Sequence, residues 1–586
     1  MEQWMVYQKK DDFNRIAEKY GIDPVVARLL TNRGVTGDEK IRLFLQGGLY
    51  DLPDVHCMKD IDLLVDILVR KIKEHKKIRV IGDYDVDGVM SSFILHEALT
   101  LAGADFDVEI PERIRDGYGL NVRLVEKALN DGVDTILTCD NGISALDEIA
   151  FAKGQGLTVL VTDHHQIPFT ETDGIRTERK SAADVIVNPH QRDCEYPYKD
   201  LCGAGVVYAV VTALYERLGF SGDEVEKLLE FVAMATVCDV MPLTYVNRIL
   251  VKEGLKRIHH TKNTGMKALI QAAGLEPKDI EAWHFGFVLG PCINATGRLE
   301  TAKQALALFA EKEEKSAGEI AADLIALNNE RKDMTKQGVE EGKRLVESGG
   351  YNDDPVLVLY LPDVHESIAG LIAGRIREQY ARPVFVLTKG EGCVKGSGRS
   401  TESYSMYEQM CRCSELLTCF GGHPMAAGMS LPEENVDTFQ KRINELCPYS
   451  IEEISARIHI DMQMPPEYAD VALVRQFDTL APFGTGNPKP LFVDRDFKLI
   501  RMRIFGKNKN VLRMTLCTAR GNLVEAVYFG ETGAFEQYLT EKFGENQVLC
   551  AKQGRENMIT FSMVYQIRID NWQNNENIQL EMKYYR

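Results

Sequence analysis

Between about residues 76 and 240 the sequence alternates short β-branched runs with amphipathic stretches, and this alternation restricts the fold more than any other feature of the chain. The β-branched runs are KKIRVIG, DFDVEI, DTILTC and LTVLVT, and the amphipathic stretches include residues 88–101, 120–130 and 144–153. Such alternation is typical of a doubly wound, mostly parallel sheet with helices on both faces. Ligands of such sheets bind beyond the carboxyl ends of the strands, so a site is expected there.

The remaining sequence predicts a second lobe and a barrel. Residues 203–236 and 248–347 have helical spacing, and EIAADLIALNNERKDMTKQGVEEGKRLVES predicts one long connecting helix. A second α/β pattern covers about 353–447, and from about 455 alternating strands with Gly, Asn and Pro turns predict an OB-like β-barrel. The fold class is therefore α/β, with two α/β lobes joined by a long helix and a C-terminal OB-like barrel. The expected segments are 1–50, 51–245, 246–350, 351–450 and 455–586.

The composition of the chain indicates where the protein is located in the cell and what it binds. No apolar run approaches the roughly 20 residues that span a bilayer, and the start, MEQWMVYQKKDDFNR, lacks the apolar core of a signal peptide. The 13 cysteines include no zinc-type CxxC pair. We therefore expect a cytoplasmic protein with no membrane partner. The net charge of −18 argues against a general nucleic-acid binder, but residues 494–513, DRDFKLIRMRIFGKNKNVLR, are locally basic.

Carboxylates and histidines follow several of the predicted strands. Three carboxylates, Asp83, Asp85 and Asp87, lie within five residues after the first strand. Because close carboxylates repel one another, they are stabilised best by divalent cations, although a solvated acidic turn would also have this sequence. The later members of the set are Asp140 after DTILTC, Asp163, His164 and His165 after LTVLVT, and Asp239 after FVAMATVC.

Together these side chains can hold two Mn²⁺ or Mg²⁺ ions, although His165 alone could be a structural histidine. Such a pair of ions activates a water and stabilises in-line displacement at phosphorus. The chain contains no GxxxxGK[ST] sequence, which leaves a P-loop nucleotide hydrolase unsupported, and no Ser-His-Asp order is readable. The sequence therefore predicts metal-dependent phosphoester hydrolysis.

The motifs DYDVDG, DNG, DHH and CDVMPL, in this order and spacing, resemble the four motifs of the DHH phosphoesterases. The segments GAGVVYAV, NATGRLE, GSGRS, GGHPMAAG and LAPFGTGNPKPLF resemble the branch of that family formed by bacterial single-strand-specific exonucleases. The resemblance covers roughly residues 50 to 580. It implies a DHH domain over 51–245, a DHH-associated domain over 351–450 and a nucleic-acid-binding barrel over 455–586.

The resemblance also implies roles for individual residues. The implied metal ligands are Asp85, Asp87, Asp140, His164 and Asp239, with Asp140 as the bridge. Asp83 and Asp163 would be further ligands or hydrogen-bonding partners of ligands, and Asp83, Asp140 and His165 are the implied catalytic residues, with His165 contacting the phosphate. The implied substrate-binding residues are Arg113, Arg298, Ser397, Arg399, Ser400 and His423.

The glycines of GSGRS and GGHPMAAG allow backbone N–H groups to approach a phosphate and form an anion-binding nest, although tight turns would also use them. One departure is Ser367 in HESIAGLIAGRI, where the family pattern has glycine, and this leaves a close backbone contact at that position unsupported. In the barrel, the aromatic side chains of Phe492, Phe497 and Phe505 are candidates for base stacking, with core packing as the alternative for at least half of them.

The resemblance implies a monomeric exonuclease that degrades single-stranded DNA from a 5′ end and releases mononucleotides. It also implies work beside a helicase and a single-strand-binding protein in repair and recombination. Two alternatives remain at this point. One is a DHH phosphodiesterase for short oligoribonucleotides, cyclic dinucleotides or pyrophosphate, and the other is a non-catalytic single-strand-binding scaffold.

Overall fold

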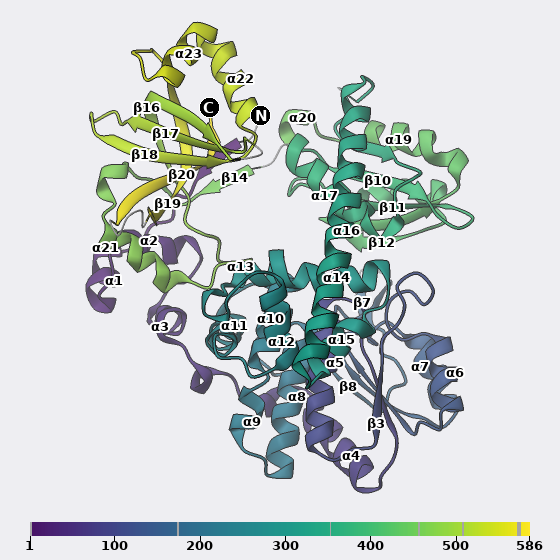
Figure 1. Cartoon of the computed structure of the whole chain (residues 1–586). Coiled ribbons are helices and arrows are strands. Elements are labelled where there is room, and N and C mark those ends of the chain that lie inside the picture. Colours follow the sequence, from purple (N-terminus) through teal and green to yellow (C-terminus); the bar gives the residue numbers. More distant parts are fainter. Residues whose placement is uncertain (1–2, 173–174, 352, 455–456, 507–508, 571–575) are drawn as a thin grey trace. The chain divides into compact units, whose positions relative to one another are not determined.

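The computed structural model describes residues 3–172, 175–351, 353–454, 457–506, 509–570 and 576–586 (Figure 1). The chain divides into two compact units. The larger unit contains residues 46–455 and 482–486, and the smaller contains residues 1–45, 456–481 and 487–586. No helix among the described residues is both long and apolar enough to cross a membrane.

The first lobe of the larger unit is built on a five-stranded parallel sheet with the strand order β3-β2-β4-β5-β8. Its strands are β2 (Ile78–Ile81), β3 (Phe106–Glu109), β4 (Thr135–Cys139), β5 (Thr158–Thr162) and β8 (Val185–Val187). Every residue of β2 and β4 is buried, because helices cover both faces of the sheet. The predicted doubly wound sheet is confirmed.

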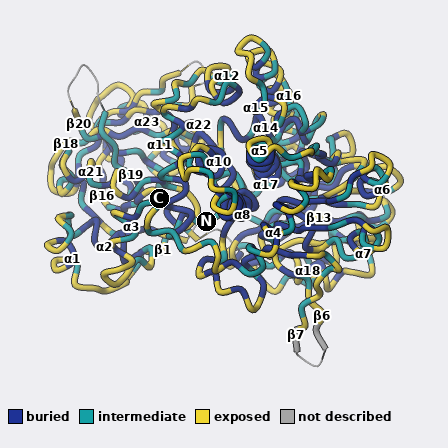
Figure 2. The backbone as a smooth tube through the Cα atoms, turned by 90° about the horizontal axis from the view of Figure 1, so that it is seen from below, coloured by how far each residue is buried: buried dark blue, intermediate teal, exposed yellow. Residues whose placement is uncertain are grey.

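Two hydrophobic clusters separate the helices of this lobe by sheet face. One cluster joins β2, β4 and β5 to α4 (Ile61–Lys73), α5 (Val86–Leu101), α8 (Gly203–Leu218) and α10 (Leu229–Cys238). The other joins the opposite face to α6 (Val122–Asn130) and α7 (Leu146–Gly154). Figure 2 shows α5 and α8 as mostly buried segments. A separate hairpin consists of β6 (Phe169–Thr172) and β7 (Ile175–Glu178).

A helical region follows the first lobe and ends in the predicted connecting helix. It contains α11 (Tyr245–Ile258), α12 (Thr264–Ala272), α13 (Ala282–His284), a π-helix (Phe285–Leu289), α14 (Gly290–Leu299) and α15 (Lys303–Ala310), whereas the short helix α9 (Gly222–Glu226) lies between α8 and α10 of the first lobe. The connecting helix α16 (Glu314–Glu347) is 34 residues long. Two of its glycines, Gly338 and Gly342, lie where a Cβ would come within 2.4 Å of Ile372 and 2.5 Å of Ile376 on α17 (Ala369–Tyr380). These glycines therefore permit close packing of the two helices.

The second lobe has a mixed five-stranded sheet with the order β12-β13-β11-β10-β9. Its strands are β9 (Leu357–Tyr360), β10 (Val384–Lys389), β11 (Val394–Arg399), β12 (Cys419–His423) and β13 (Ala426–Leu431). Besides α17, its helices are α18 (Met406–Cys411), α19 (Val436–Glu445) and α20 (Ile451–Ile454). Most of GSGRS lies in β11 between β10 and β13, so its backbone N–H groups belong to paired strands and the nest prediction for this segment is wrong.

The smaller unit joins the N-terminal residues to the C-terminal ones. β1 (Gln3–Val6) pairs in parallel with β14 (Arg457–Ile460), and α1 (Phe13–Tyr20), α2 (Pro24–Asn32) and α3 (Asp38–Gln46) follow β1. The Arg33 side chain forms an ion pair of 3.3 Å with Asp461 and donates to the Asn487 side chain at 2.8 Å. This pairing of the two ends of the chain was not visible in the sequence.

The C-terminal strands form the predicted OB-like arrangement. The strands are β15 (Met462–Gln463), β16 (Phe492–Phe505), β17 (Val511–Cys517), β18 (Leu523–Phe529), β19 (Thr560–Asp570) and β20 (Asn577–Tyr585). Their order is β15-β16-β17-β18-β20-β19, and β16 also pairs with β19. The accompanying helices are α21 (Val471–Phe477), α22 (Thr532–Phe543) and α23 (Glu545–Gln553). Phe492 and Phe497 are core residues, whereas Phe505 is 45% exposed, so only Phe505 of the three can contact a base.

Short 3-10 helices connect several of these elements. They lie at Leu49–Asp51, Val55–Cys57, Pro277–Asp279, Glu366–Ile368, Ser414–Leu416, Glu433–Asn435, Pro466–Tyr468 and Asp478–Leu480.

Candidate metal centre

The predicted ligands converge at the carboxyl edge of the parallel sheet. β2, β4 and β5 are neighbours, so the residues that follow them meet at one edge. Asp239 joins them from the C-terminal end of α10. Three groups of side chains have ligand atoms within 4.8 Å of one another: Asp83, Asp85 and Asp140; Asp87, His164 and Asp239; and Asp140, His164 and His165.

Backbone hydrogen bonds orient two of the carboxylates. Asp85 caps the N-terminus of α5 and accepts from the Gly88 N–H at 3.1 Å. Asp87 accepts from the N–H groups of Gly203 at 2.5 Å and Ala204 at 2.8 Å, at the start of α8. Helix N-termini favour nearby negative charge, so α5 and α8 help to hold these side chains in place.

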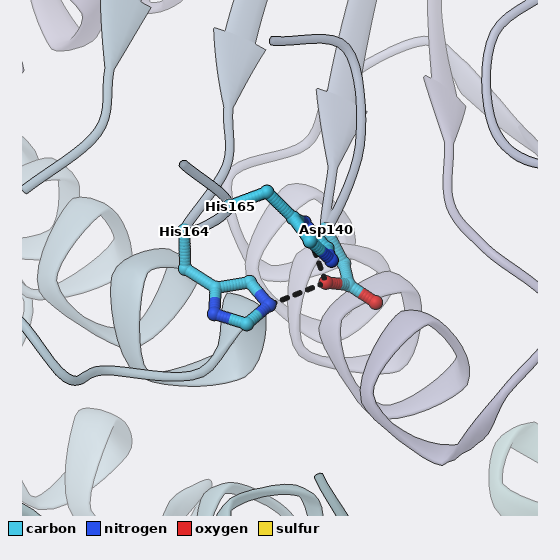
Figure 3. Close-up of side chains that lie close together, drawn as sticks. All are labelled: Asp140, His164 and His165. Carbon is cyan, nitrogen blue, oxygen red and sulfur yellow. Dashed lines mark ion pairs between the residues drawn. The ribbon is translucent and has the colours of Figure 1, made fainter. Parts of the chain in front are cut away.

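Asp140 lies at the centre of the cluster (Figure 3). It has a left-handed backbone with φ of 62° and is only 2% exposed. Its Oδ1 lies 3.1 Å from Nε2 of His164 and 4.0 Å from Nδ1 of His165. A Cβ on Gly203 would lie 2.6 Å from the Cβ of Asp140, so α8 can begin this close to the carboxylate only with glycine at its first position.

The unsatisfied atoms of the cluster fit a divalent cation. Oδ1 of Asp140 and Nε2 of His164 are buried, and although they lie 3.1 Å apart, neither atom makes a hydrogen bond among the described residues. Buried polar atoms are normally paired, and an exception calls for a ligand or an ion. Carboxylate oxygens and imidazole nitrogens are the donors that Mn²⁺ accepts, and Mg²⁺ accepts the oxygens. The residues present therefore fit the metal ions predicted from the sequence.

The electrostatics of the cluster support the same conclusion. Burial, and after it the repulsion from neighbouring carboxylates, raises the pKa values of Asp83, Asp85 and Asp140 above the ordinary range. Burial and the charges of Asp87 and Asp85 raise the pKa of Asp239 to about 9. Burial also lowers the pKa of His164, which favours the neutral imidazole that binds metals. A cation would relieve the repulsion among the carboxylates.

Asp163 forms hydrogen bonds through both carboxylate oxygens. Its Oδ1 accepts from the N–H groups of His164 at 2.7 Å and His165 at 3.0 Å and from Nδ1 of His165 at 2.8 Å, and its Oδ2 accepts from the Ile143 N–H at 2.8 Å. Burial opposes ionisation, but these bonds hold the pKa of Asp163 below its ordinary value. Of the two roles expected for Asp163, metal ligand or hydrogen-bonding partner of ligands, this geometry fits the second.

The contact with Asp163 fixes the charge and orientation of His165. Burial alone would lower the pKa of His165, but the hydrogen bond to Asp163 and the surrounding carboxylates raise it to about 9. With Nδ1 directed at Asp163, the Nε2 atom is left to donate to a ligand. The imidazole is half-buried at the edge of the cluster, as a phosphate-contacting residue must be.

Three predicted arginines come together beside the carboxylates. Burial lowers the pKa of Arg298 to about 10, and the nearby charges of Arg113, Arg331 and Arg399 contribute to this shift. The Arg113 guanidinium lies 5.2 Å from the ring centre of Tyr84, and Arg298 donates to the Ser367 carbonyl at 2.5 Å. Among the described residues, Arg113, Arg298 and Arg399 take part in no ion pair. We call these three residues the arginine cluster, and such a concentration of positive charge suits a phosphate.

The residues predicted in the second lobe divide into two groups. Ser397 and Arg399 of β11 lie opposite Gly428 and Ala426 of the neighbouring strand β13. His423 of β12, on the other side of β13, also lies opposite Ala426. The side chains of Ser397, Arg399 and His423 therefore point to the same face of the sheet. Ser400 is only 1% exposed, and its hydroxyl donates to the Tyr404 carbonyl at 2.6 Å. The predicted phosphate contact of Ser400 is therefore wrong, because the side chain is buried and already bonded.

Two functional positions were missed at the sequence level. The Tyr118 hydroxyl donates to the Asp140 carbonyl at 2.7 Å and lies 3.2 Å from Nδ1 of His165. In NATGRLE, a Cβ on Gly297 would lie 2.3 Å from the Tyr84 carbonyl oxygen, so α14 packs directly on the loop that carries Asp83 and Asp85. In the sequence, the available signals were that Tyr118 stands between two glycines and that Gly297 precedes Arg298.

Comparison with known families assigns the three parts of the chain separately. Residues 77–236 match the N-terminal domain of the DHH family, residues 353–448 match the DHHA1 domain, and residues 460–584 match the RecJ OB domain.

Relatives match nearly the whole chain. The single-stranded-DNA-specific exonuclease RecJ of Bacillus subtilis is 32% identical over 98% of this chain and 69% of its own length. The Haemophilus influenzae protein of the same name is 32% identical over 96% of both chains. Crystal structures of Thermus thermophilus RecJ with Mn²⁺ and with Mg²⁺ cover 100% of this chain. The Mn²⁺ structure has a TM-score of 0.81 at 26% identity over 79% of that chain, and the Mg²⁺ structure 0.74 at 25% over 78%.

Proposed function

The chain belongs to the RecJ family of exonucleases, and on that premise we propose that it hydrolyses single-stranded DNA stepwise from the 5′ end and releases mononucleotides. Membership of this family makes it a metal-dependent, single-stranded-DNA-specific exonuclease. The polarity, the mononucleotide product and the residue roles given below are the proposal. The hydrolytic site is supported by two buried atoms inside a ring of carboxylates, Asp140 Oδ1 and His164 Nε2, which make no hydrogen bond among the described residues, whereas the polarity and the product rest on the family resemblance.

Asp85, Asp87, Asp140, His164 and Asp239 would hold two Mn²⁺ or Mg²⁺ ions, with Asp140 shared between them. When bound, the ions activate a water and stabilise the charge on the transferring phosphoryl group.

Asp83 and His165 complete the catalytic set around these ligands. Asp83 accepts a hydrogen bond from the Gly119 N–H at 3.4 Å. From there its carboxylate would help to orient the ligand side chains of Asp85 and Asp140. His165, held by Asp163 at 2.8 Å, donates from Nε2 to an oxygen of the scissile phosphate. Because Asp163 fixes the orientation of the ring before substrate arrives, this contact needs little rearrangement during the reaction.

The arginine cluster would bind the terminal 5′ phosphate. Arg399 extends from β11 of the second lobe, whereas Arg113 and Arg298 belong to the first lobe and the helical region. A guanidinium can make two parallel hydrogen bonds to one phosphate. Ser397 and His423, on the same sheet face as Arg399, would add contacts to the terminal nucleotide. A phosphate held at a fixed distance from the carboxylates would limit each cut to one nucleotide.

The OB-like strands support a polymeric substrate. Residues 494–513 are rich in Lys and Arg, and Phe505 is exposed at the end of β16. OB folds bind single strands through a basic groove with aromatic stacking platforms. We further propose that the protein acts as a monomer in the cytoplasm, beside a helicase and a single-strand-binding protein that expose and protect its substrate during repair and recombination.

Digestion of end-labelled DNA tests the proposed function. A 20-nucleotide strand labelled at its 5′ end, the same strand labelled at its 3′ end and the matching duplex are incubated with the enzyme and Mn²⁺. We expect the 5′ label to be released at once as a mononucleotide. The 3′-labelled strand should become gradually shorter, and the duplex should remain intact.

Other results would contradict the proposal in distinct ways. Early release of the 3′ label would reverse the polarity, and rapid cutting of oligoribonucleotides or cyclic dinucleotides with an intact DNA strand would favour another DHH phosphodiesterase. Tight strand binding without any cleavage in Mn²⁺ or Mg²⁺ would leave only a binding scaffold.

A further inference from the structure

A cationic groove lies between α16 and α17, outside the carboxylate cluster. Its volume is about 360 Å³, and the described residues that line it include no acid. The cations are Arg331, Lys332, Lys336 and Lys343 of α16 and Arg375 of α17. Five positive charges in one groove are notable on a chain with a net charge of −18, because random placement would mix acids among them.

The positive charges of the groove are largely uncompensated. Among the described residues, Arg331, Lys332, Lys336 and Lys343 take part in no ion pair, and Arg375 contacts only Glu378, at 3.2 Å on an exposed surface. Exposed pairs of this kind contribute little. Burial and the charge of Arg375 lower the pKa of Arg331, which shows that the two helices hold their cations within repulsive reach. An anion bound in the groove would relieve this repulsion.

The two helices that form the groove pack closely against each other. Gly338 and Gly342 allow α17 to approach α16 so closely that a Cβ at either glycine would meet Ile372 or Ile376 within 2.5 Å. The side chains of Val339 and Leu371 add an apolar strip among the cations.

The spacing of the lysines distinguishes a strand from a single nucleotide. Lys332, Lys336 and Lys343 are four and seven residues apart, so at 100° per residue they lie within about 40° of one another around the helix. At 1.5 Å per residue, the row from Lys332 to Lys343 is about 16 Å long. Successive phosphates of a stacked strand are about 3.4 Å apart along its axis, so the row matches several phosphates, whereas a mononucleotide carries one.

The positive charges of the groove lie close enough to the arginine cluster to affect it. Arg331 is one of the charges that lower the pKa of Arg298, and Arg331 in turn lies within reach of Arg375. The groove and the arginine cluster therefore form one region of positive potential, which attracts a strand as a polyanion.

We propose that the groove between α16 and α17 binds successive phosphates of the DNA strand beyond the terminal nucleotide and thereby favours long substrates. This inference rests on the proposed exonuclease function and adds a second strand contact to it. It requires that Lys332, Lys336 and Lys343 affect strand binding and leave the hydrolytic step unchanged.

The test is the triple variant Lys332→Gln, Lys336→Gln, Lys343→Gln, compared with wild type on a 20-nucleotide strand and on a trinucleotide, both 5′-phosphorylated. The measured quantity is kcat/KM in Mn²⁺ between 50 and 200 mM salt. Each neutralised phosphate of a single strand contributes about 0.7 to the slope of log affinity against log salt, so we expect the slope on the long strand to fall by about 2. The value of kcat/KM on that strand should fall roughly 10-fold or more at low salt, and the trinucleotide value should change less than about twofold.

The matched control is Lys278→Gln, Lys312→Gln, Lys315→Gln, which removes the same charge from exposed positions outside the groove. The control should keep the wild-type slope. An unchanged slope in the groove variant, or equal losses on the long strand and the trinucleotide, would overturn the proposal.

A separate arm uses thymidine 5′-monophosphate as an inhibitor. Weaker inhibition of the groove variant without any loss on the long strand would assign the groove to the released nucleotide and would also overturn the proposal. A failure of the proposed function itself is recognised separately, because the wild type would then degrade neither substrate.

Discussion

Gly297→Ala should disable the enzyme although Gly297 contacts neither metal ligand side chains nor substrate. The new Cβ would lie 2.3 Å from the Tyr84 carbonyl oxygen and 3.3 Å from the Tyr84 Cβ. Ordinary contacts between carbon and oxygen need at least about 3.3 Å, so the loop or α14 has to move by about 1 Å. Tyr84 lies between Asp83 and Asp85, so the shift is passed directly to the carboxylates.

Two magnitudes follow from this displacement. A misplacement of 1 Å at a reacting centre costs about 10²-fold in rate, so we expect kcat to fall by about that factor. Overpacking of a buried contact costs about 1–3 kcal/mol of stability, and the melting temperature of the larger unit should fall by a few degrees. The assay is single-turnover cleavage of a 5′-phosphorylated strand in saturating Mn²⁺, together with a thermal melt of the same preparation.

Gly318→Ala is the matched control. Gly318 also lies within a helix, but a Cβ there would meet nothing within 4 Å. The control should keep full activity and gain up to about 1 kcal/mol from better helix propensity. If Gly297→Ala retained more than about a third of the wild-type rate, α14 would not position the DYDVDG loop and the reasoning would be refuted.

Three further predictions concern other parts of the chain. Arg399→Ala should mainly raise KM for 5′-phosphorylated strands, by about 10-fold or more, and narrow their advantage over 5′-hydroxyl strands; an unchanged preference would remove Arg399 from end recognition. Glu230 is 4% exposed, and burial raises its pKa from 4.5 to about 7, so its stability penalty is absent below pH 4.5, grows as pH rises and is complete above pH 7. Glu230→Gln should therefore match the wild type in melts at pH 4 and exceed it by up to about 3 kcal/mol at pH 8; equal stability at both pH values would contradict this. Phe505→Ala should weaken binding of a 20-nucleotide strand by about 1–3 kcal/mol and leave trinucleotide cleavage unchanged, and a loss on both substrates would exclude a stacking role.

The sequence indicated that these carboxylates and histidines lie close together, because the signal for this is local. Each apolar strand leads directly into its polar residues, and parallel neighbours necessarily bring Asp85, Asp140 and His164 to one edge. The sequence says less about the direction in which a side chain points than about its position along the chain. Asp163 has the same residue type and the same kind of position as a ligand, and only the four N–H groups around it show that it orients His165.

The second lobe shows where sequence patterns misled. Glycine in GSGRS suggested a loop, but Gly396 and Gly398 lie in a strand where a Cβ would come within 2.6 Å of Leu387 and Met406 respectively. Glycine was needed there for close packing, and the letters alone do not distinguish that need from a turn. The pairing of β1 with β14 was invisible for a related reason, since it joins residues more than 450 positions apart.

The number of Mn²⁺ ions bound per chain, measured with hydrolysis on the same samples, tests the central claim most directly. Wild type and Asp140→Ala are compared, with Asp147→Ala, an exposed acid on α7, as the control. The account predicts two ions in the wild type and the control, fewer than two in Asp140→Ala, and nearly complete loss of strand cleavage in that variant alone. Two bound ions in Asp140→Ala, or more than about a tenth of wild-type turnover, which corresponds to less than about 1.4 kcal/mol in the barrier, would contradict it.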